Sequence, residues 1–359
     1  MAQRNYGTYV ECKRVEGGID KYFKHVKDLG VGGYGMVYAA NTMELARVEI
    51  GDHLPDQVAI KKVPARDFHA QPDQIRYHSM LSAELRMLKT IELHHSLRYY
   101  GCLHIGSDLY VITGIAPGQE LFTLITEGEL DLDDKALILD AVALAIEEFH
   151  QAGYAHRDIK PDNIFVDKRL DGDNLPYYHA TLVDYGFICS KLDLSDFGCV
   201  ARCGTVQYSD PAQKLRNLAS LMLGDWWSFA HVAYILYVKR FLHKLVGGRL
   251  QAHVAQADDL IKVGTPMPIY DMIIRITRYP NSQLERPTPE QILETTHEAA
   301  EVVRFAIGIE HLTIEDEDVD EDVDEDVDVD VDVEVTKAKV PSTTLRVQSV
   351  DQPANCLMF

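Results

Sequence analysis

The fold is decided by the stretch His156-Arg157-Asp158-Ile159-Lys160-Pro161-Asp162-Asn163. It combines a carboxylate that can accept a proton, a lysine two positions later and an asparagine whose oxygen can bind a metal ion. Transfer of a phosphoryl group from a nucleotide to a hydroxyl requires groups of these kinds. Because a short motif also arises by chance, this interpretation depends on further motifs in the right order along the chain.

Four further motifs accompany this stretch, two before it and two after it. They are Gly30-Val31-Gly32-Gly33-Tyr34-Gly35-Met36-Val37, Val58-Ala59-Ile60-Lys61, Asp184-Tyr185-Gly186 and Ser209-Asp210-Pro211-Ala212. Over roughly residues 21–304, the five motifs resemble those of the eukaryotic-type serine/threonine protein kinase family. The last two depart from the Asp-Phe-Gly and Ala-Pro-Glu of that family.

The resemblance implies an α+β fold of two lobes, a small sheet-plus-helix N-lobe and a mainly helical C-lobe. We expect an N-terminal extension at 1–20, the N-lobe at 21–115, the C-lobe at 116–304 and a tail at 305–359. Alternation and helical periodicity agree with this division. They predict a hairpin at 22–40, strands at 57–63, 99–104, 109–113 and 180–183, and helices at 75–91, 135–151, 226–246 and 287–303.

The glycine-rich motif is ambiguous by itself, because dinucleotide-binding folds use the same glycine spacing between a strand and a helix. Here Val37 continues a strand and Lys61 lies on another strand, which favours a kinase-like loop over ATP; an ordinary glycine-rich hairpin is the alternative. The resemblance implies ATP contacts from Gly30, Gly32, Gly33, Gly35, Val37, Ala59, Lys61, Thr113, Gly114, Ala116, Glu120 and Phe165. Among these, Thr113 is a small residue at the entrance to a pocket behind the adenine.

The catalytic residues follow from the same resemblance. Lys61 would bind the α- and β-phosphates while a carboxylate of the predicted helix at 75–91, Glu84, holds the lysine in place. Asp158 would accept the proton of the substrate hydroxyl, and Lys160 would neutralise charge on the transferred group. A lysine at this position is the serine/threonine pattern, so we expect serine and threonine as acceptors.

Magnesium would be held by Asn163 and by one of two aspartates. Asp196, in Asp196-Phe197-Gly198, matches the family string literally, whereas Asp184 follows a predicted strand. Spacing favours Asp184, because it leaves room for a full activation segment before Ala212. We therefore expect Mg²⁺ at Asn163 and Asp184.

Two further positions are expected to support the catalytic loop and the C-lobe. Asp225 resembles the family aspartate that anchors the catalytic-loop backbone, a function compatible with an alternative position as a helix N-cap. Arg286 resembles the arginine that pairs with the glutamate of Ala-Pro-Glu, which is Ala212 here. Either Asp210 substitutes for that glutamate or the ion pair is absent.

Regulation is expected to be unusual. Arg157 belongs to the class that reads a phosphate on the activation loop, yet the usual phosphorylated position is occupied by Ala201. We expect another group to satisfy Arg157 and activity that is independent of phosphate, with Ser195 or Ser190 as substitute phosphorylation sites.

Negative charge is concentrated near the C-terminus. The 359 residues carry a net charge of −21, and 315–334 contains 14 acidic residues and no basic one, which leaves −7 elsewhere. Like charges on neighbouring positions repel, so we expect 305–359 to be a disordered acidic tail; an arm that docks on a basic partner is the alternative. The sign of the charge disfavours nucleic-acid binding.

Six cysteines, at 12, 102, 189, 199, 203 and 356, have the spacing of neither a zinc site nor a disulfide framework, which favours a reducing compartment. The sequence has no signal-peptide pattern and no apolar run near the ~20 residues of a membrane span. We expect an intracellular protein, cytoplasmic, nuclear or both. Membrane association is expected only if Cys356, in a C-terminal prenylation box, is lipidated.

The function that these features imply is ATP- and Mg²⁺-dependent phosphorylation of serine and threonine in proteins. Glu120 and Asp162 would favour basic residues near the acceptor. A pseudokinase or scaffold that binds nucleotide is one alternative, based on the altered Ala-Pro-Glu and the acidic tail. A small-molecule kinase of related fold is another, which the peptide-positioning pattern at 204–211 disfavours.

Overall fold

The computed structural model describes residues 12–32, 35–64, 72–194, 203–210, 217–241, 243–246, 249–252, 257–278 and 285–317. The chain divides into one unit at Met1–Leu312 and a second at Thr313–Phe359. The first unit contains the sheets and helices that concern the site. None of the helices in the described ranges combines the length and the hydropathy that crossing a membrane requires.

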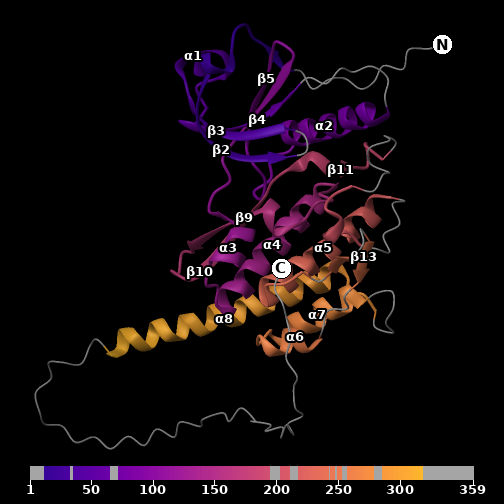
Figure 1. Cartoon of the computed structure of the whole chain (residues 1–359). Helices are drawn as coiled ribbons and strands as arrows, with labels where there is room; N and C mark the ends of the chain where they lie inside the picture. The colour runs from indigo at the N-terminus through magenta and orange to yellow at the C-terminus, as the bar shows by residue number, and fades with distance from the viewer. Residues whose placement is uncertain are drawn as a thin grey trace, which may run out of the picture. The chain divides into compact units, whose positions relative to one another are not determined.

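The N-terminal region is built on a six-stranded sheet in the order β1-β5-β6-β4-β3-β2. Figure 1 labels β2, β3, β4 and β5 of this sheet. The strands are β1 (Lys13–Arg14), β2 (Phe23–Gly32), β3 (Gly35–Thr42), β4 (Gln57–Val63), β5 (Tyr99–Ile105) and β6 (Asp108–Thr113). Helix α2 (Pro72–Thr90) follows β4 along the chain. The expected hairpin and three strands are confirmed, and β4 has the expected bounds.

Two short elements of this region were not expected. Helix α1 (Glu44–Ile50) lies in the connection between β3 and β4. Ala46 is its buried residue, so the helix lacks the apolar face that sequence periodicity detects. Strand β1 lies in the N-terminal extension and pairs in parallel with β5, with Lys13 opposite Leu103.

The pairing of β1 with β5 also overturns the expectation drawn from cysteine spacing. Cys12 and Cys102 form a disulfide with their Cα atoms 4.8 Å apart, although 90 residues separate them in sequence. Cys189 is disulfide-bonded as well. Because strand pairing rather than local spacing brings such cysteines together, the inference of a reducing compartment loses its basis.

The C-terminal region is mainly helical, which confirms the α+β fold. Its helices are α3 (Leu121–Glu127), α4 (Leu132–Gln151), α5 (Leu218–Val238), α6 (Ala257–Lys262), α7 (Met267–Arg278) and α8 (Pro289–Glu317). Capping explains the start of the two core helices: the Asp131 carboxylate accepts from Asp134 N–H at 2.7 Å, and Asn217 forms a capping box with Ser220. Helix α5 is buried on nearly all sides, with Trp226, Trp227 and Phe229 in the core.

Two helix ends differ from expectation. Helix α5 ends at Val238, where Lys239 takes a left-handed φ of 54°, and β12 (His243–Val246) then pairs with β13 (Arg249–Ala252). The last part of the helix predicted at 226–246 is therefore wrong. Helix α8 continues to Glu317, so the start of the predicted tail is helical, while its expected disorder from 318 on lies outside the described residues.

Two small sheets lie next to the catalytic-loop sequence along the chain. Strand β9 (Ile164–Leu170) pairs with β7 (Gln119–Glu120) and with β10 (Pro176–Leu182). Strand β8 (Tyr154–Ala155) pairs with β11 (Cys189–Ser190). These pairings place the catalytic-loop sequence and Asp184 on neighbouring chain segments.

The uncertainty about Arg286 is resolved in favour of Asp210. The Arg286 guanidinium lies 3.3 Å from an Asp210 carboxylate oxygen, and both side chains are largely buried. Arg286 also donates to the Leu223 carbonyl at 2.7 Å and lies over the Trp227 ring, so it ties several parts of the helical region together.

Replacing Arg286 by Met should lower the free energy of unfolding by about 3 kcal/mol, because it leaves a buried carboxylate without its counter-charge. Chemical denaturation measures this change. The control is Lys262→Met at an exposed position of α6, expected within about 0.5 kcal/mol of the parent. Equal stabilities for the two variants would contradict the structural importance of the Asp210–Arg286 pair.

Candidate active site

A cleft of about 470 Å³ lies between the sheet and the helical region. This volume falls within the range of small-molecule sites. Apolar side chains of both regions line it, including Leu29, Val37, Ala59, Val111 and Phe165. The cleft therefore offers an apolar slot of the size that a nucleotide base and ribose need.

Most of the residues expected to bind nucleotide or metal line this one cleft. They are Gly30, Gly35, Val37, Ala59, Lys61, Glu84, Thr113, Gly114, Ala116, Glu120, Lys160, Asn163, Phe165 and Asp184. Gly32 lies at the end of β2, opposite Gly35. Gly33 lies outside the described residues.

The glycines of the loop differ in what they require. A Cβ on Gly35 would come within 2.0 Å of the Lys62 carbonyl oxygen, so the fold itself demands glycine there. A Cβ on Gly30 would meet no protein atom within 4 Å. The protein itself therefore leaves open space beside Gly30, which lines the cleft. Glycine there would let the backbone approach a nucleotide closely, as expected from the sequence.

Lys61, Glu84 and Asp184 meet inside the cleft. The Lys61 ammonium lies 2.7 Å from one Glu84 carboxylate oxygen and 3.6 Å from an oxygen of Asp184. Burial is the main cause that raises the pKa of Glu84, and the nearby Lys61 opposes this effect. Strand β4 and helix α2 thus present a lysine whose position is fixed by a buried carboxylate.

The catalytic loop forms a second cluster around Asp158, whose side chain is buried. The Asn163 amide nitrogen donates to an Asp158 carboxylate oxygen at 3.0 Å and to its carbonyl at 2.9 Å. Thr205 N–H donates to the other carboxylate oxygen at 2.7 Å, and the Lys160 ammonium lies 3.3 Å from the carboxylate. Lys160 also donates to the Thr205 hydroxyl at 3.0 Å.

Gly204 makes the approach of this segment possible. It has a φ of 83°, in the left-handed region that favours glycine, and a Cβ there would lie 2.2 Å from the Arg157 carbonyl oxygen. The expected peptide-positioning segment therefore lies directly against the catalytic loop.

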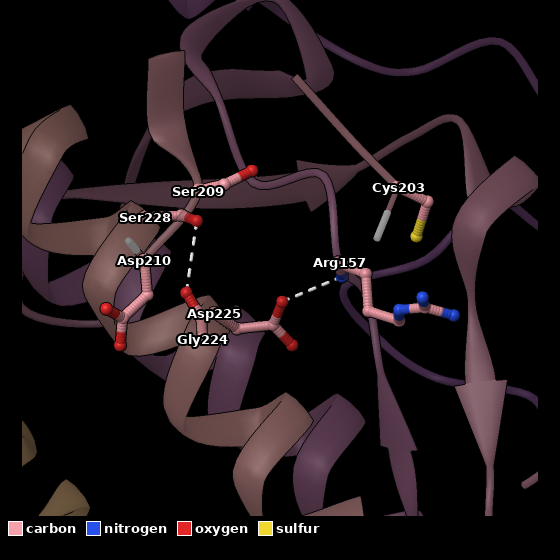
Figure 2. Close-up of a pocket in the computed structure, with 7 residues that line it drawn as sticks. All are labelled: Arg157, Cys203, Ser209, Asp210, Gly224, Asp225 and Ser228. Carbon is pink, nitrogen blue, oxygen red and sulfur yellow. Dashed lines mark hydrogen bonds between the residues drawn. The ribbon is translucent and has the colours of Figure 1, made fainter. Parts of the chain in front are cut away.

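Asp225 fixes the backbone that precedes Asp158 (Figure 2). Its carboxylate accepts from His156 N–H at 2.8 Å and from Arg157 N–H at 2.7 Å, and the His150 ring lies 2.9 Å away. Arg157 itself has a left-handed φ of 71°, a strained conformation that these bonds stabilise. Asp225 lies inside α5, so the alternative position as an N-cap is wrong.

Tyr185 gives the Asp-Tyr-Gly motif an anchor that phenylalanine would lack. Its ring is buried beside Phe149, and its hydroxyl donates to the Leu182 carbonyl at 2.6 Å and accepts from Leu97 N–H at 2.8 Å. Burial raises the pKa of this hydroxyl, which keeps it protonated. Adjacent Asp184 adopts a left-handed φ of 60° and lines the cleft.

The competing aspartate, Asp196, and the rest of Asp-Phe-Gly at 196–198 lie outside the described residues, as do Ala201 and Ala212. Asp184 is placed beside Lys61 and Asn163 in the cleft lining. The assignment of Mg²⁺ to Asp184 rather than Asp196 stays a prediction, and the position of Asp184 beside Lys61 suits it.

In the connection between the lobes, one of the backbone groups expected to bind adenine already has a partner within the protein. Gly114 N–H already donates to the Arg98 carbonyl at 2.8 Å, so the contribution left to Gly114 is its carbonyl oxygen. Thr113 is buried and paired with β4 at Ala59. Since Leu88 and Leu97 also line the cleft, the cleft extends past Thr113 toward α2.

The fit of a divalent cation can be judged from the donor atoms. Asp184 offers carboxylate oxygens, and Asn163 commits its amide nitrogen to Asp158, which orients the amide oxygen away from that bond. No cluster of three or more His, Cys, Asp or Glu side chains occurs among the described residues. Few protein oxygens completed by phosphate oxygens suit Mg²⁺, so the donor set fits this ion.

Several cleft residues were not anticipated from the sequence. They are Leu29, Leu88, Leu97, Val111, Ile115, Val183 and Tyr185. Strand alternation could have identified two of them: Val111 is the cross-strand partner of Lys61, and Leu29 lies just before the glycine motif. The others reach the cleft through tertiary packing, which a local pattern does not encode.

Comparison with known proteins agrees with this geometry. The protein kinase domain matches residues 23–301. A maternal embryonic leucine zipper kinase of Danio rerio is 24% identical over 220 residues, 60% of this chain and 29% of that protein. Ribosomal protein S6 kinase beta of Caenorhabditis elegans is 26% identical over 254 residues, 67% and 43% of the two chains. Ribosomal protein S6 kinase alpha-2 of Homo sapiens is 28% identical over 210 residues, 58% and 26%.

The chain spans less than half the length of these curated relatives. The match to the domain, by contrast, extends over most of the chain and includes both clusters of the cleft. On this evidence the chain belongs to the protein kinase family.

Proposed function

We propose that this protein transfers the γ-phosphoryl group of ATP to serine and threonine hydroxyls of protein substrates. The observation that carries the proposal is the convergence of two clusters on one cleft. Lys61, Glu84 and Asp184 meet at one place, which we call the nucleotide cluster. Asp158, Lys160 and Asn163 meet at another, which we call the catalytic cluster. These clusters supply the groups that hold phosphates and the groups that act on an incoming hydroxyl.

Asp158 would orient the acceptor hydroxyl and take its proton. The hydroxyl oxygen forms a bond to the γ-phosphorus while the bond from that phosphorus to the β,γ-bridging oxygen breaks, and ADP leaves. Lys160, held between the Asp158 carboxylate and the Thr205 hydroxyl, would lie beside the transferred group. Lys61 would neutralise the α- and β-phosphates. Mg²⁺ bound through Asp184, Asn163 and phosphate oxygens would supply further charge neutralisation.

The described contacts favour a protein kinase over the two alternatives. A pseudokinase derived support from the altered Ala-Pro-Glu motif, and the Asp210–Arg286 pair offers a substitute for its missing ion pair. A small-molecule kinase is disfavoured by the position of the segment that would bind a peptide substrate. Thr205 of that segment donates a backbone hydrogen bond to the Asp158 carboxylate, so the segment lies beside the catalytic loop.

The finer assignments are proposals of the same kind. We propose a basic partner for the acidic residues beyond 317. The proposed use of ATP, and no longer the cysteine spacing, is the ground on which we propose a cytoplasmic or nuclear location. We propose membrane association only upon prenylation of Cys356, which intact mass from a eukaryotic host would reveal. Basic residues near the acceptor would be recognised by Glu120 and Asp162. Burial followed by repulsion from Asp162 raises the pKa of Glu120, which marks this part of the cleft as a place where a cation is favourable.

Asp158→Asn should lower kcat for phosphorylation of a generic protein substrate by about 10²–10⁴-fold, because it removes the proton acceptor. Binding of ATP with Mg²⁺, measured by calorimetry, should remain within about threefold of the parent since the nucleotide cluster is intact. Asp173→Asn, at an exposed turn position, is the matched control and should leave both quantities unchanged. Phosphorylation that survives in the Asp158→Asn variant at the parental rate would contradict the proposal.

A positional peptide library should reveal a preference for arginine or lysine near the acceptor. Glu120→Gln and Asp162→Asn should each weaken that preference by about fivefold in kcat/KM, as the loss of one partly exposed charge contact predicts. A library profile dominated by acidic or proline-directed peptides would exclude this specificity.

A further inference from the structure

A buried carboxylate lies where the activation segment begins. Asp193 is 2% exposed, and its carboxylate forms an ion pair with the Arg86 guanidinium. The other carboxylate oxygen accepts from Ser190 N–H at 2.9 Å and from the Ser190 hydroxyl at 2.6 Å. Asp193 N–H in turn donates to the Ser190 carbonyl at 3.1 Å, which closes the turn. Arg86 and Ser190 bind different oxygens of the Asp193 carboxylate, so the carboxylate is held from two sides.

The two partners of Asp193 lie on different elements, Arg86 on helix α2 and Ser190 on strand β11. Arg86 lies on α2, two positions after Glu84, which holds Lys61. Ser190 lies on β11, whose pairing with β8 sets Ser190 opposite Tyr154 just before the catalytic loop. Helix α2 and strand β11 lie side by side (Figure 1). One carboxylate thus connects the helix of the nucleotide cluster to the strand beside the catalytic cluster.

We infer that the Arg86–Asp193 pair is a built-in positioning element that keeps α2 where Glu84 reaches Lys61, without a phosphate on the activation segment. This inference rests on the proposed kinase function. A phosphate bound by arginine would order such a segment only after modification, whereas the Asp193 carboxylate is always present. The Asp193 carboxylate is buried, so removing Arg86 would leave a buried charge without this counter-charge.

The same contacts argue against Ser190 as a substitute phosphorylation site. Its hydroxyl is buried and bonded to Asp193. A phosphate there would place a second negative group beside a buried carboxylate, which like-charge repulsion and desolvation disfavour. Ser195, the other substitute site, lies outside the described residues.

The test uses full-length protein treated with phosphatase and checked for absence of phosphate by intact mass. The parent should phosphorylate substrate without any activating kinase. Arg86→Met and Asp193→Asn should each lower kcat/KM by about tenfold, and the double variant should be no lower than the worse single variant, because both remove one interaction. Arg86→Lys, which keeps the charge, should recover most of the activity.

A matched control separates this effect from a general loss of charge on α2. Lys89→Met removes an exposed positive charge from the last turn of α2 and should leave kcat/KM unchanged. Hydrogen exchange distinguishes a local change in α2 from a general loss of stability, which would speed exchange in every helix. Amides of α2 should exchange faster in Arg86→Met than in the parent, while those of α4 and α5 remain protected.

The outcomes distinguish this inference from the function on which it rests. A folded Arg86→Met variant with parental kcat/KM would overturn the inference, and since Arg86 is partly exposed this variant remains informative even if Asp193→Asn fails to fold. A parent that is inactive without phosphate but active after phosphorylation would also overturn it, while leaving the kinase function in place. A parent inert in both forms would refute both.

Discussion

The buried ion pair between Lys61 and Glu84 joins the sheet to helix α2, and the nucleotide cluster depends on it. The Lys61 side chain is 15% exposed and that of Glu84 only 5%. Burial raises the pKa of Glu84, so its ionised form is costly and is stabilised chiefly by Lys61. A pair of this kind exists only if other contacts keep the helix and the strand at the correct separation.

Those other contacts come from parts of the chain far from either residue. Arg86 fastens α2 to Asp193, which is 107 residues away in sequence. Tyr185 fastens the Asp184 segment through its hydroxyl to Leu97 and Leu182. Asp225 fixes the catalytic-loop backbone. The site is therefore assembled by polar contacts that each join two separate segments of the chain. Because these contacts depend on one another, removing one of them is expected to disturb the others.

The sequence predicted the features that local chemistry determines. Strand alternation and helical periodicity predicted the elements that carry Lys61 and Glu84. The functions of these residues and of Asp158 and Asn163 followed from the resemblance of short motifs to those of protein kinases. The end of α5 could not be predicted in this way. Apolar residues continue beyond Val238, and periodicity does not reveal that Lys239 turns the chain into a hairpin.

Contacts between distant segments were also beyond the reach of sequence patterns. Nothing in the neighbourhood of Cys12 indicates Cys102, and nothing near Arg86 indicates Asp193, because strand and helix packing create both contacts. The choice between Asp210 and no partner for Arg286 likewise required tertiary geometry. Departures from the family pattern, in Asp-Tyr-Gly and Ser-Asp-Pro-Ala, were visible in sequence, but their compensating bonds were not.

The central claim is that Lys61 and Glu84 act as one unit in phosphoryl transfer. A double-mutant cycle of Lys61→Met, Glu84→Gln and the combined variant, measured as kcat/KM for ATP, tests it most directly. Each single variant should lose about 10²-fold, and the combined variant should lose little more than the worse single one, since both remove the same interaction. Losses that multiply in the combined variant would contradict the claim, because they would mean that the two residues act independently.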